Sequence, residues 1–167
     1  MTILLKNAKI YDGTANPPFP GDLLLENDRI VRVAPRIDEG ADKVYDLQGK
    51  SVAPGFIDSH SHNDWFAICK DCLPCFEPFI RQGITSFVTG NCGLSAAPFG
   101  PAHREEILAY LAPITGEAPP ELETETLAGY FASQPPSPIH TGMLVGAGVL
   151  RADAAGYALQ RLEKRHY

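Results

Sequence analysis

Short apolar runs of strand type, separated by polar turn residues, make up the first fifty residues. Four runs have the length and the β-branched composition of strands: residues 3–11, 22–26, 29–33 and 44–47. Asn27 and Asp28 lie between the second and third runs and indicate a hairpin. No apolar period typical of a helix occurs here, so residues 1–52 are predicted to form a small β-sheet unit.

The pattern changes near residue 53, where strand-type runs begin to alternate with helical stretches. The predicted elements are a strand at residues 52–58, a helix at 76–82, a strand at 84–89, helices that begin near Pro101 and at 123–133, and a strand at 141–145. Alternation of this kind implies a parallel sheet, which needs cover on both of its faces. Residues 53–167 are therefore predicted to be α/β, while residues 157–167 read as a charged, helix-like tail.

Charge and composition narrow the classes of function. The 167 residues carry a net charge of −6, and a nucleic-acid partner would require a basic face instead. No run of about 18 apolar residues is present, so no transmembrane helix and no membrane partner are predicted. The first residues lack the apolar centre of a signal peptide, and a cytoplasmic location is expected.

Two histidines at alternate positions are the first candidates for chemistry. His60 and His62 follow the apolar residues Phe56 and Ile57, and residues i and i+2 of a strand face the same side. Both imidazoles can therefore point at one metal ion, at the end of a barrel strand where active sites form. Two solvated histidines in a surface loop are the alternative, which the flanking residues make the weaker interpretation.

A cysteine follows the next predicted strand. Gly90, Asn91, Cys92 and Gly93 come directly after residues 84–89. A thiolate at this position is a good ligand for zinc, and the glycines allow a sharp turn of the backbone. Taken alone, such a residue is more often a buried structural cysteine.

Three further cysteines recur at intervals of three residues. Cys69, Cys72 and Cys75 have the spacing of a metal or iron–sulfur ligand run, but cluster motifs need a fourth thiolate, and only Cys92 remains. A zinc site of three cysteines and one histidine is a second interpretation. The third interpretation is that the three cysteines lie on one side of the first helix of a barrel. In a reducing cytosol a disulfide framework is not expected.

Two longer motifs carry a resemblance to a known family. Residues 53–62, Ala-Pro-Gly-Phe-Ile-Asp-Ser-His-Ser-His, resemble the first-strand signature of the amidohydrolase superfamily. Residues 82–98, which contain Gly-Asn-Cys-Gly, resemble the second-strand region of the N-acyl-D-amino-acid deacylases, and residues 142–151 resemble their third-strand stretch. The resemblance covers most of residues 1–156.

The resemblance implies an architecture and a ligand set. Residues 1–52 would be an N-terminal β-sandwich segment, and residues 53–167 the first part of a distorted TIM-like (β/α)8 barrel. His60, His62 and Cys92 match the family's metal ligands, with Zn²⁺ as the implied cofactor. A whole barrel takes about 250 residues, so the barrel is expected to be incomplete in this chain. The general-base aspartate, which the family carries on its last strand, is expected beyond the end of this chain, and the catalytic residues stay unknown.

The implied activity is zinc-dependent hydrolysis of the amide bond of a small N-acyl-D-amino acid, or of a related N-acyl or cyclic amide. Two other functions stay open. The family commonly has a histidine where this chain has Ala147, which favours a non-catalytic remnant or a subunit that acts only in a homo-oligomer or complex. A metal protein built on Cys69, Cys72 and Cys75 is the second alternative.

Overall fold

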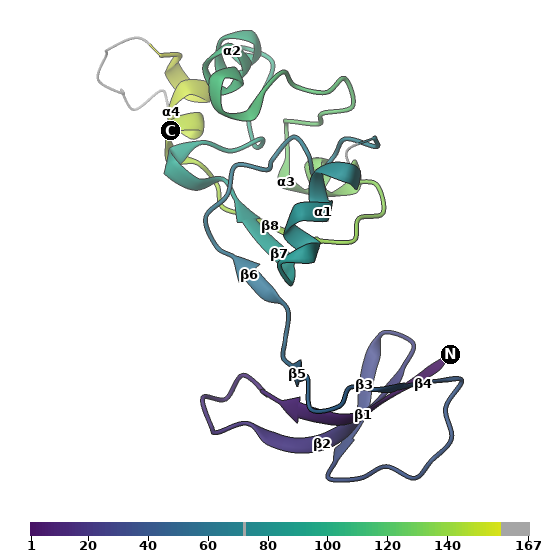
Figure 1. The fold of residues 1–167 in the computed structure, drawn as a ribbon. Helices are drawn as coiled ribbons and strands as arrows, with labels where there is room; N and C mark the ends of the chain where they lie inside the picture. Colours follow the sequence, from purple (N-terminus) through teal and green to yellow (C-terminus); the bar gives the residue numbers. More distant parts are fainter. Residues whose placement is uncertain (72, 158–167) are drawn as a thin grey trace. The chain divides into compact units, whose positions relative to one another are not determined.

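The computed structural model describes residues 1–71 and 73–157, and the chain divides into two compact units, Met1–Pro54 and Gly55–Tyr167 (Figure 1). Each unit has its own hydrophobic core and its own sheet. Strands and helices together give a mixed α/β chain, which confirms the α/β class predicted from the sequence.

The first unit is a five-stranded sheet. Its strands are β1 (Thr2–Ile10), β2 (Phe19–Glu26), β3 (Arg29–Ala34), β4 (Lys43–Asp46) and β5 (Ser51–Val52). The order is β3-β2-β1-β4, with β5 also paired to β1. The pairs β1–β2 and β2–β3 are antiparallel, whereas β4 and β5 run parallel to β1. The predicted hairpin around Asn27 is confirmed, and Asn27 has the positive φ of 55° that such a turn needs.

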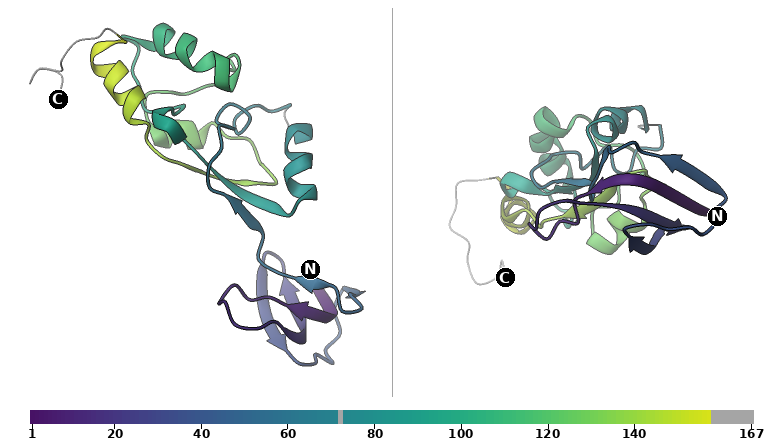
Figure 2. Two further views of the ribbon diagram at one scale, coloured as in Figure 1. Left: turned by 60° about the vertical axis from the view of Figure 1, so that its left-hand side comes forward. Right: turned by 60° about the horizontal axis from the view of Figure 1, so that its bottom comes forward.

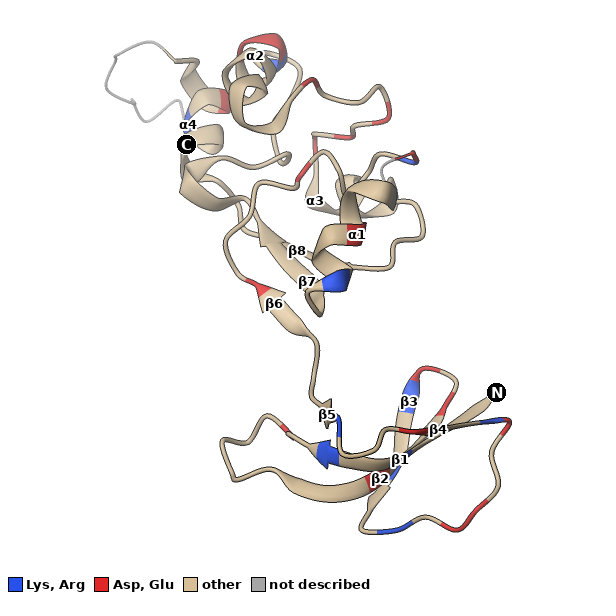
Figure 3. Ribbon diagram, viewed as in Figure 1, with Lys and Arg blue, Asp and Glu red and all other residues tan. Residues whose placement is uncertain are grey.

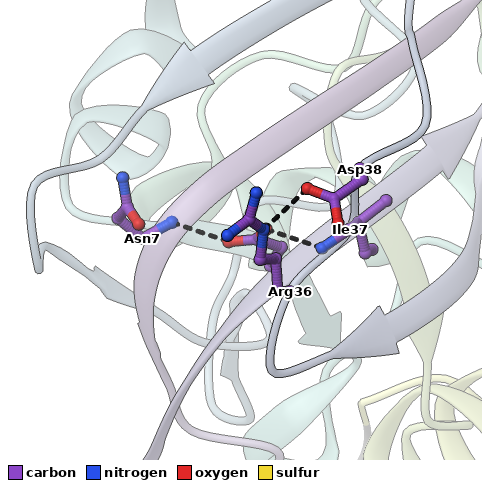
Figure 4. A network of polar contacts seen from close by, with 5 residues as sticks. Asn7, Arg36, Ile37 and Asp38 are labelled. Atoms are coloured by element: carbon purple, nitrogen blue, oxygen red, sulfur yellow. Dashed lines mark hydrogen bonds and ion pairs between the residues drawn. The ribbon is translucent and has the colours of Figure 1, made fainter.

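The buried carboxylate of Asp22 accepts hydrogen bonds at an irregularity in the pairing of this sheet. The register of β1 and β2 shifts between Leu5 and Ala8, and Asn7 adopts a φ of 56° there. The amide of Asn7, released from the ladder, donates to Asp22 Oδ1 at 2.9 Å, and the Ile37 amide donates to Oδ2 at 2.9 Å (Figure 4). Burial by itself would raise the pKa of Asp22, but these two amides, together with the charges of nearby Lys6 and Arg36, lower that pKa below its usual value.

The second unit has a three-stranded parallel sheet in the order β6-β7-β8. The strands are β6 (Phe56–Asp58), β7 (Ile84–Thr89) and β8 (His140–Met143). The helices are α1 (Leu73–Arg81), the 3-10 turn η1 (Asn91–Gly93), α2 (Arg104–Thr115), α3 (Leu127–Ala132) and α4 (Ala147–Ala155). Figure 2 shows these helices beside the sheet. The parallel sheet predicted from the alternation of elements is confirmed.

The core of the second unit forms around the central strand. Phe87 of β7 is 1% exposed and stacks on Phe76 of α1, with the ring centroids 5.9 Å apart. Ile107 and Leu111 of α2 and Tyr130 of α3 belong to the same buried cluster. Strands β7 and β8 contain no Lys, Arg, Asp or Glu (Figure 3), as is usual for strands of a parallel sheet.

Several predicted boundaries were wrong. The helix predicted at residues 123–133 is only α3, because Thr126 is extended and its side chain accepts a hydrogen bond from the Gly129 amide, which caps the helix. Helix α2 begins at Arg104 and not at Pro101. Helix α4 was not predicted. Most of the predicted helix-like tail, residues 158–167, lies outside the described residues. Among the helices that the structure describes, none has the length and apolar character to cross a bilayer.

Candidate metal centre

The candidate ligands follow the carboxyl ends of two neighbouring strands. Strand β6 ends at Asp58, and His60 and His62 lie in the loop that follows it. Strand β7 ends at Thr89, and Cys92 lies in the turn η1 directly afterwards. Because β6 and β7 pair in parallel, both loops begin at the same edge of the sheet.

The three predicted ligands come together at this edge. His60 Nε2 lies 3.3 Å from Cys92 Sγ, and the rings of His60 and His62 are edge to face with centroids 5.9 Å apart. One ligand atom from each residue lies within 4.8 Å of the other two. Among the described residues, this is the one group of three or more His, Cys, Asp or Glu side chains so arranged.

The donor set has the chemistry and nearly the spacing that zinc requires. Zinc–nitrogen bonds of about 2.0–2.1 Å and zinc–sulfur bonds of about 2.3 Å place tetrahedral neighbours roughly 3.6 Å apart. The 3.3 Å between His60 Nε2 and Cys92 Sγ is close to this value, and the widest donor pair would have to approach by about 1 Å. His62 Nδ1 is shielded from solvent and, among the described residues, has no hydrogen-bond partner. Two imidazoles and a thiolate therefore fit a zinc ion that keeps a fourth position open.

Tight backbone packing holds the turn that bears Cys92. Cys92 itself adopts a left-handed conformation, with φ 58° and ψ 20°. Gly90 has a φ of 76°, and a Cβ there would collide with the carbonyl oxygen of Leu144. A Cβ at Gly146 would in turn collide with the Gly93 carbonyl. Glycine is required at Gly90 both by its backbone conformation and by the close approach of the chain after β8.

Side-chain amide hydrogens join the two ligand-bearing loops. Asn91 is buried, and its Nδ2 donates to Val88 O at 2.9 Å and to Ser61 O at 3.3 Å. Ser61 lies between the two histidines, and its own amide donates to Val88 O at 3.1 Å. The sequence analysis did not single out Asn91, although its position beside Cys92 in a glycine-flanked turn was the available signal.

A second polar residue missed by the sequence analysis is Asp64, which is 2% exposed. Its Oδ1 accepts from the Ala96 amide at 3.3 Å, and its main-chain carbonyl accepts from the Tyr130 hydroxyl at 2.7 Å. Burial raises the pKa of Asp64, although the Ala96 amide and nearby His62 and Thr89 oppose that shift. Burial and the charge of Asp64 likewise raise the pKa of Tyr130. Asp64 thereby connects the histidine loop to the segment after η1 and to α3.

The other cysteines do not gather into a described cluster. Cys69 is engaged in a disulfide, against the expectation from the sequence, which came from an assumed compartment and not from any distance between thiols. Cys75 is a free, exposed thiol on α1, and Cys72 lies outside the described residues. Ala147, where the family resemblance led us to look for a histidine, is exposed at the first position of α4.

Active-site residues of α/β enzymes follow the carboxyl ends of parallel strands, and imidazole and thiolate groups are zinc donors, so this arrangement fits the class of metal-dependent α/β enzymes. Comparison of sequences agrees with this class. The chain is 34% identical to a D-aminoacylase of Alcaligenes xylosoxydans xylosoxydans over 152 residues, which is 90% of this chain and 30% of that protein. It is also 34% identical to an N-acyl-D-glutamate deacylase of the same organism, over 92% of this chain and 30% of the relative. No family model matches the chain.

Comparison of folds gives the same group of proteins. A D-aminoacylase described with a binuclear metal centre superposes with a TM-score of 0.78 and 29% identity, over 98% of this chain and 33% of that one. An N-acyl-D-glutamate deacylase from Bordetella bronchiseptica, complexed with zinc and a phosphonate inhibitor, gives a TM-score of 0.74 and 34% identity, over 91% of this chain and 31% of that one. The chain belongs to the amidohydrolase family, as a relative of the D-aminoacylases and N-acyl-D-amino-acid deacylases, and spans about 30% of the length of these curated relatives.

Proposed function

We propose that this chain contributes part of the metal site of an enzyme that hydrolyses the amide bond of N-acyl-D-amino acids. One observation supports the proposal above all: His60, His62 and Cys92 offer ligand atoms within 4.8 Å of one another, at the ends of strands β6 and β7. The chain spans about 30% of the length of its relatives, so the activity is proposed for a protein to which these residues contribute.

Zinc is the proposed cofactor, held by His60, His62 and Cys92. When bound at such a site, zinc polarises a carbonyl oxygen and lowers the pKa of a bound water molecule. The thiolate and two neutral imidazoles supply donors that zinc prefers. The N-acyl-D-glutamate deacylase relative was determined with zinc, which supports this choice, and the binuclear centre of the D-aminoacylase relative leaves the number of metal ions open.

The substrate class is inferred from the relatives. Three of them are named for N-acyl-D-amino-acid substrates or for D-aminoacylase activity, and one was determined with a phosphonate that mimics the tetrahedral intermediate of the reaction. Hydrolysis would release a carboxylate and a free D-amino acid.

The architecture predicted from the sequence is part of the proposal. We propose that residues 1–52 supply strands of a β-sandwich and that residues 53–167 supply the first strands of the barrel. The relatives with TM-scores of 0.72–0.78 support a shared fold over nearly the whole chain. Cytoplasmic location and the absence of a nucleic-acid partner stay predictions from the sequence.

Metal binding by the chain is the first experiment. Apoprotein titrated with Co²⁺ is expected to develop the charge-transfer absorption of a cobalt–thiolate bond and the visible bands of a four-coordinate ion, and Zn²⁺ should displace both. Cys92→Ser should lose the charge-transfer band, whereas Cys75→Ser, a second exposed free thiol, should keep it. Absence of bands in the native chain would contradict the proposed site.

The reaction is tested separately, in a polypeptide of the relatives' full length that includes these residues. With zinc bound, such a protein should release free amino acid from an N-acetyl-D-amino acid and much less from the L enantiomer. Zinc binding without hydrolysis of either enantiomer would favour the alternative of a non-catalytic remnant or subunit.

A further inference from the structure

Asn91 is the one buried residue of the turn that bears the candidate thiolate ligand. Its side chain is 9% exposed, while the adjacent Cys92 is exposed. A buried amide side chain is costly unless its polar atoms are bonded, so its partners indicate what the residue does.

Both partners of the Asn91 amide nitrogen are main-chain carbonyl oxygens. Nδ2 lies 2.9 Å from Val88 O and 3.3 Å from Ser61 O. Because carbonyl oxygens only accept, the nitrogen and not the oxygen of the amide must face them, and both of its hydrogens are used. One side chain therefore bridges the last part of β7 and the residue between His60 and His62.

The bridge differs in kind from the other contacts at this edge. Ser61 N and Ser61 Oγ also donate to Val88 O, at 3.1 and 3.2 Å, and attach the histidine loop to strand β7. Those two contacts do not involve the cysteine turn. The bond from Asn91 Nδ2 to Ser61 O instead joins the histidine loop to the residue that directly precedes Cys92, beside the contact between His60 and Cys92 themselves.

We propose that Asn91 is a positioning residue of the metal centre, which fixes the thiolate of Cys92 relative to the two imidazoles before a metal ion is bound. This inference rests on the proposed metal site. Removal of the bridge leaves the attachment of the loop to β7 and the packing of Gly90 and Gly93 intact, but it removes the side-chain link that sets the position of the cysteine turn relative to the histidines. Each bound metal ion must then order a turn that the native chain holds in advance, which weakens affinity.

The test compares Asn91→Ala with Thr115→Val in the full chain. Thr115 is as buried as Asn91, at 8% exposure, and its Oγ1 also donates to a main-chain carbonyl, that of Leu111 at 3.1 Å, but on helix α2. Zinc affinity is measured by competition with a chromophoric chelator. Asn91→Ala is expected to bind zinc about 10–100-fold more weakly, and its Co²⁺ derivative to show shifted visible bands. Thr115→Val should bind zinc as the native chain does.

The possible outcomes distinguish a positioning role of Asn91 from a role in stability alone, and from failure of the proposed metal site. Native zinc affinity and a native Co²⁺ spectrum in Asn91→Ala would overturn the inference, and so would a lower melting temperature with both metal readouts unchanged. If Asn91→Ala does not fold, Asn91→Ser, which keeps one donor, is expected to give intermediate affinity, and native affinity there would again overturn it. A native chain that binds no zinc would instead contradict the proposed function.

Discussion

His60 Nε2 and Cys92 Sγ lie 3.3 Å apart although the two residues are 32 positions apart in the sequence. The contact exists because β6 and β7 are parallel neighbours whose carboxyl ends meet at one edge of the sheet. A metal ion between these donors would occupy a lone pair of the sulfur and make it a poorer nucleophile. The contact therefore predicts that a bound metal ion lowers the reactivity of the Cys92 thiol.

Zinc should protect Cys92 from alkylation and leave Cys75 unprotected. Both are exposed free thiols, so each serves as the reference for the other in one molecule. At saturating zinc, iodoacetamide should modify Cys92 at least about tenfold more slowly than in the zinc-free chain, because only the zinc-free fraction reacts. Peptide mass spectrometry at timed intervals measures both rates. Equal rates at Cys92 with and without zinc, or protection that survives His60→Ala, would argue against a shared metal ion.

Gly90→Ala should destabilise the second unit by at least about 2 kcal/mol, since an alanine there combines a left-handed backbone with a clash against the main chain. Gly90 has a φ of 76°, and its missing Cβ would overlap the Leu144 carbonyl. Urea unfolding followed by the fluorescence of Trp65, the single and buried tryptophan, reports the free energy. Gly100→Ala is the matched control, because its Cβ would meet only Asp153 Oδ1 at 3.7 Å. Equal stability of the two variants would contradict the role given to Gly90.

Local patterns were sufficient to predict the parallel sheet of the second unit and its central strand, but not the first strand, which was predicted at residues 52–58 and is only Phe56–Asp58. Strand β7 occupies the predicted residues 84–89, because its β-branched and aromatic run is bounded by Gly83 and Gly90. The three candidate ligands were also singled out from the sequence, His60 and His62 as alternate residues after one strand and Cys92 chiefly through the resemblance to the N-acyl-D-amino-acid deacylases.

Residues that depend on tertiary partners could not be found in this way. Asn91 and Asp64 are buried polar residues whose importance comes from carbonyl and amide groups at least 30 residues away, Ser61 O and Ala96 N. Helix α4 was missed because it begins between Gly146 and Gly148, which usually indicate a loop, whereas here close packing against Gly93 requires small residues.

Phe87→Ala should lower the free energy of unfolding of the second unit by about 3–5 kcal/mol, the usual cost of removing a buried aromatic ring. Phe87 is 1% exposed and lies against Phe76 and Phe79, with ring centroids 5.9 and 6.5 Å away. Phe131→Ala is the comparison, because that ring is 38% exposed and should cost clearly less. The Trp65 fluorescence transition in urea measures both. A similar loss for the two variants would show that Phe87 does not have the central place in this core that its burial indicates.

Asp22→Asn should destabilise the first unit by roughly 1–3 kcal/mol at pH 7, because an asparagine can accept from only one of the two amides and turns a donor toward the other. The carboxylate accepts from Asn7 and Ile37, and its pKa in the folded chain lies below the usual value. The stabilisation is therefore present above the pKa of about 3.9 of an unfolded aspartate, and is lost as the pH falls through the folded pKa. Exchange of the Ile37 amide hydrogen should be faster in the variant, and the free energy of unfolding should depend less on pH in this acidic range. Asp38→Asn, which removes only an exposed contact with Arg36, should change stability by less than about 1 kcal/mol. If Asp22→Asn and the native chain lost stability in parallel as the pH fell, the acid sensitivity of this unit would have to come from carboxylates other than Asp22.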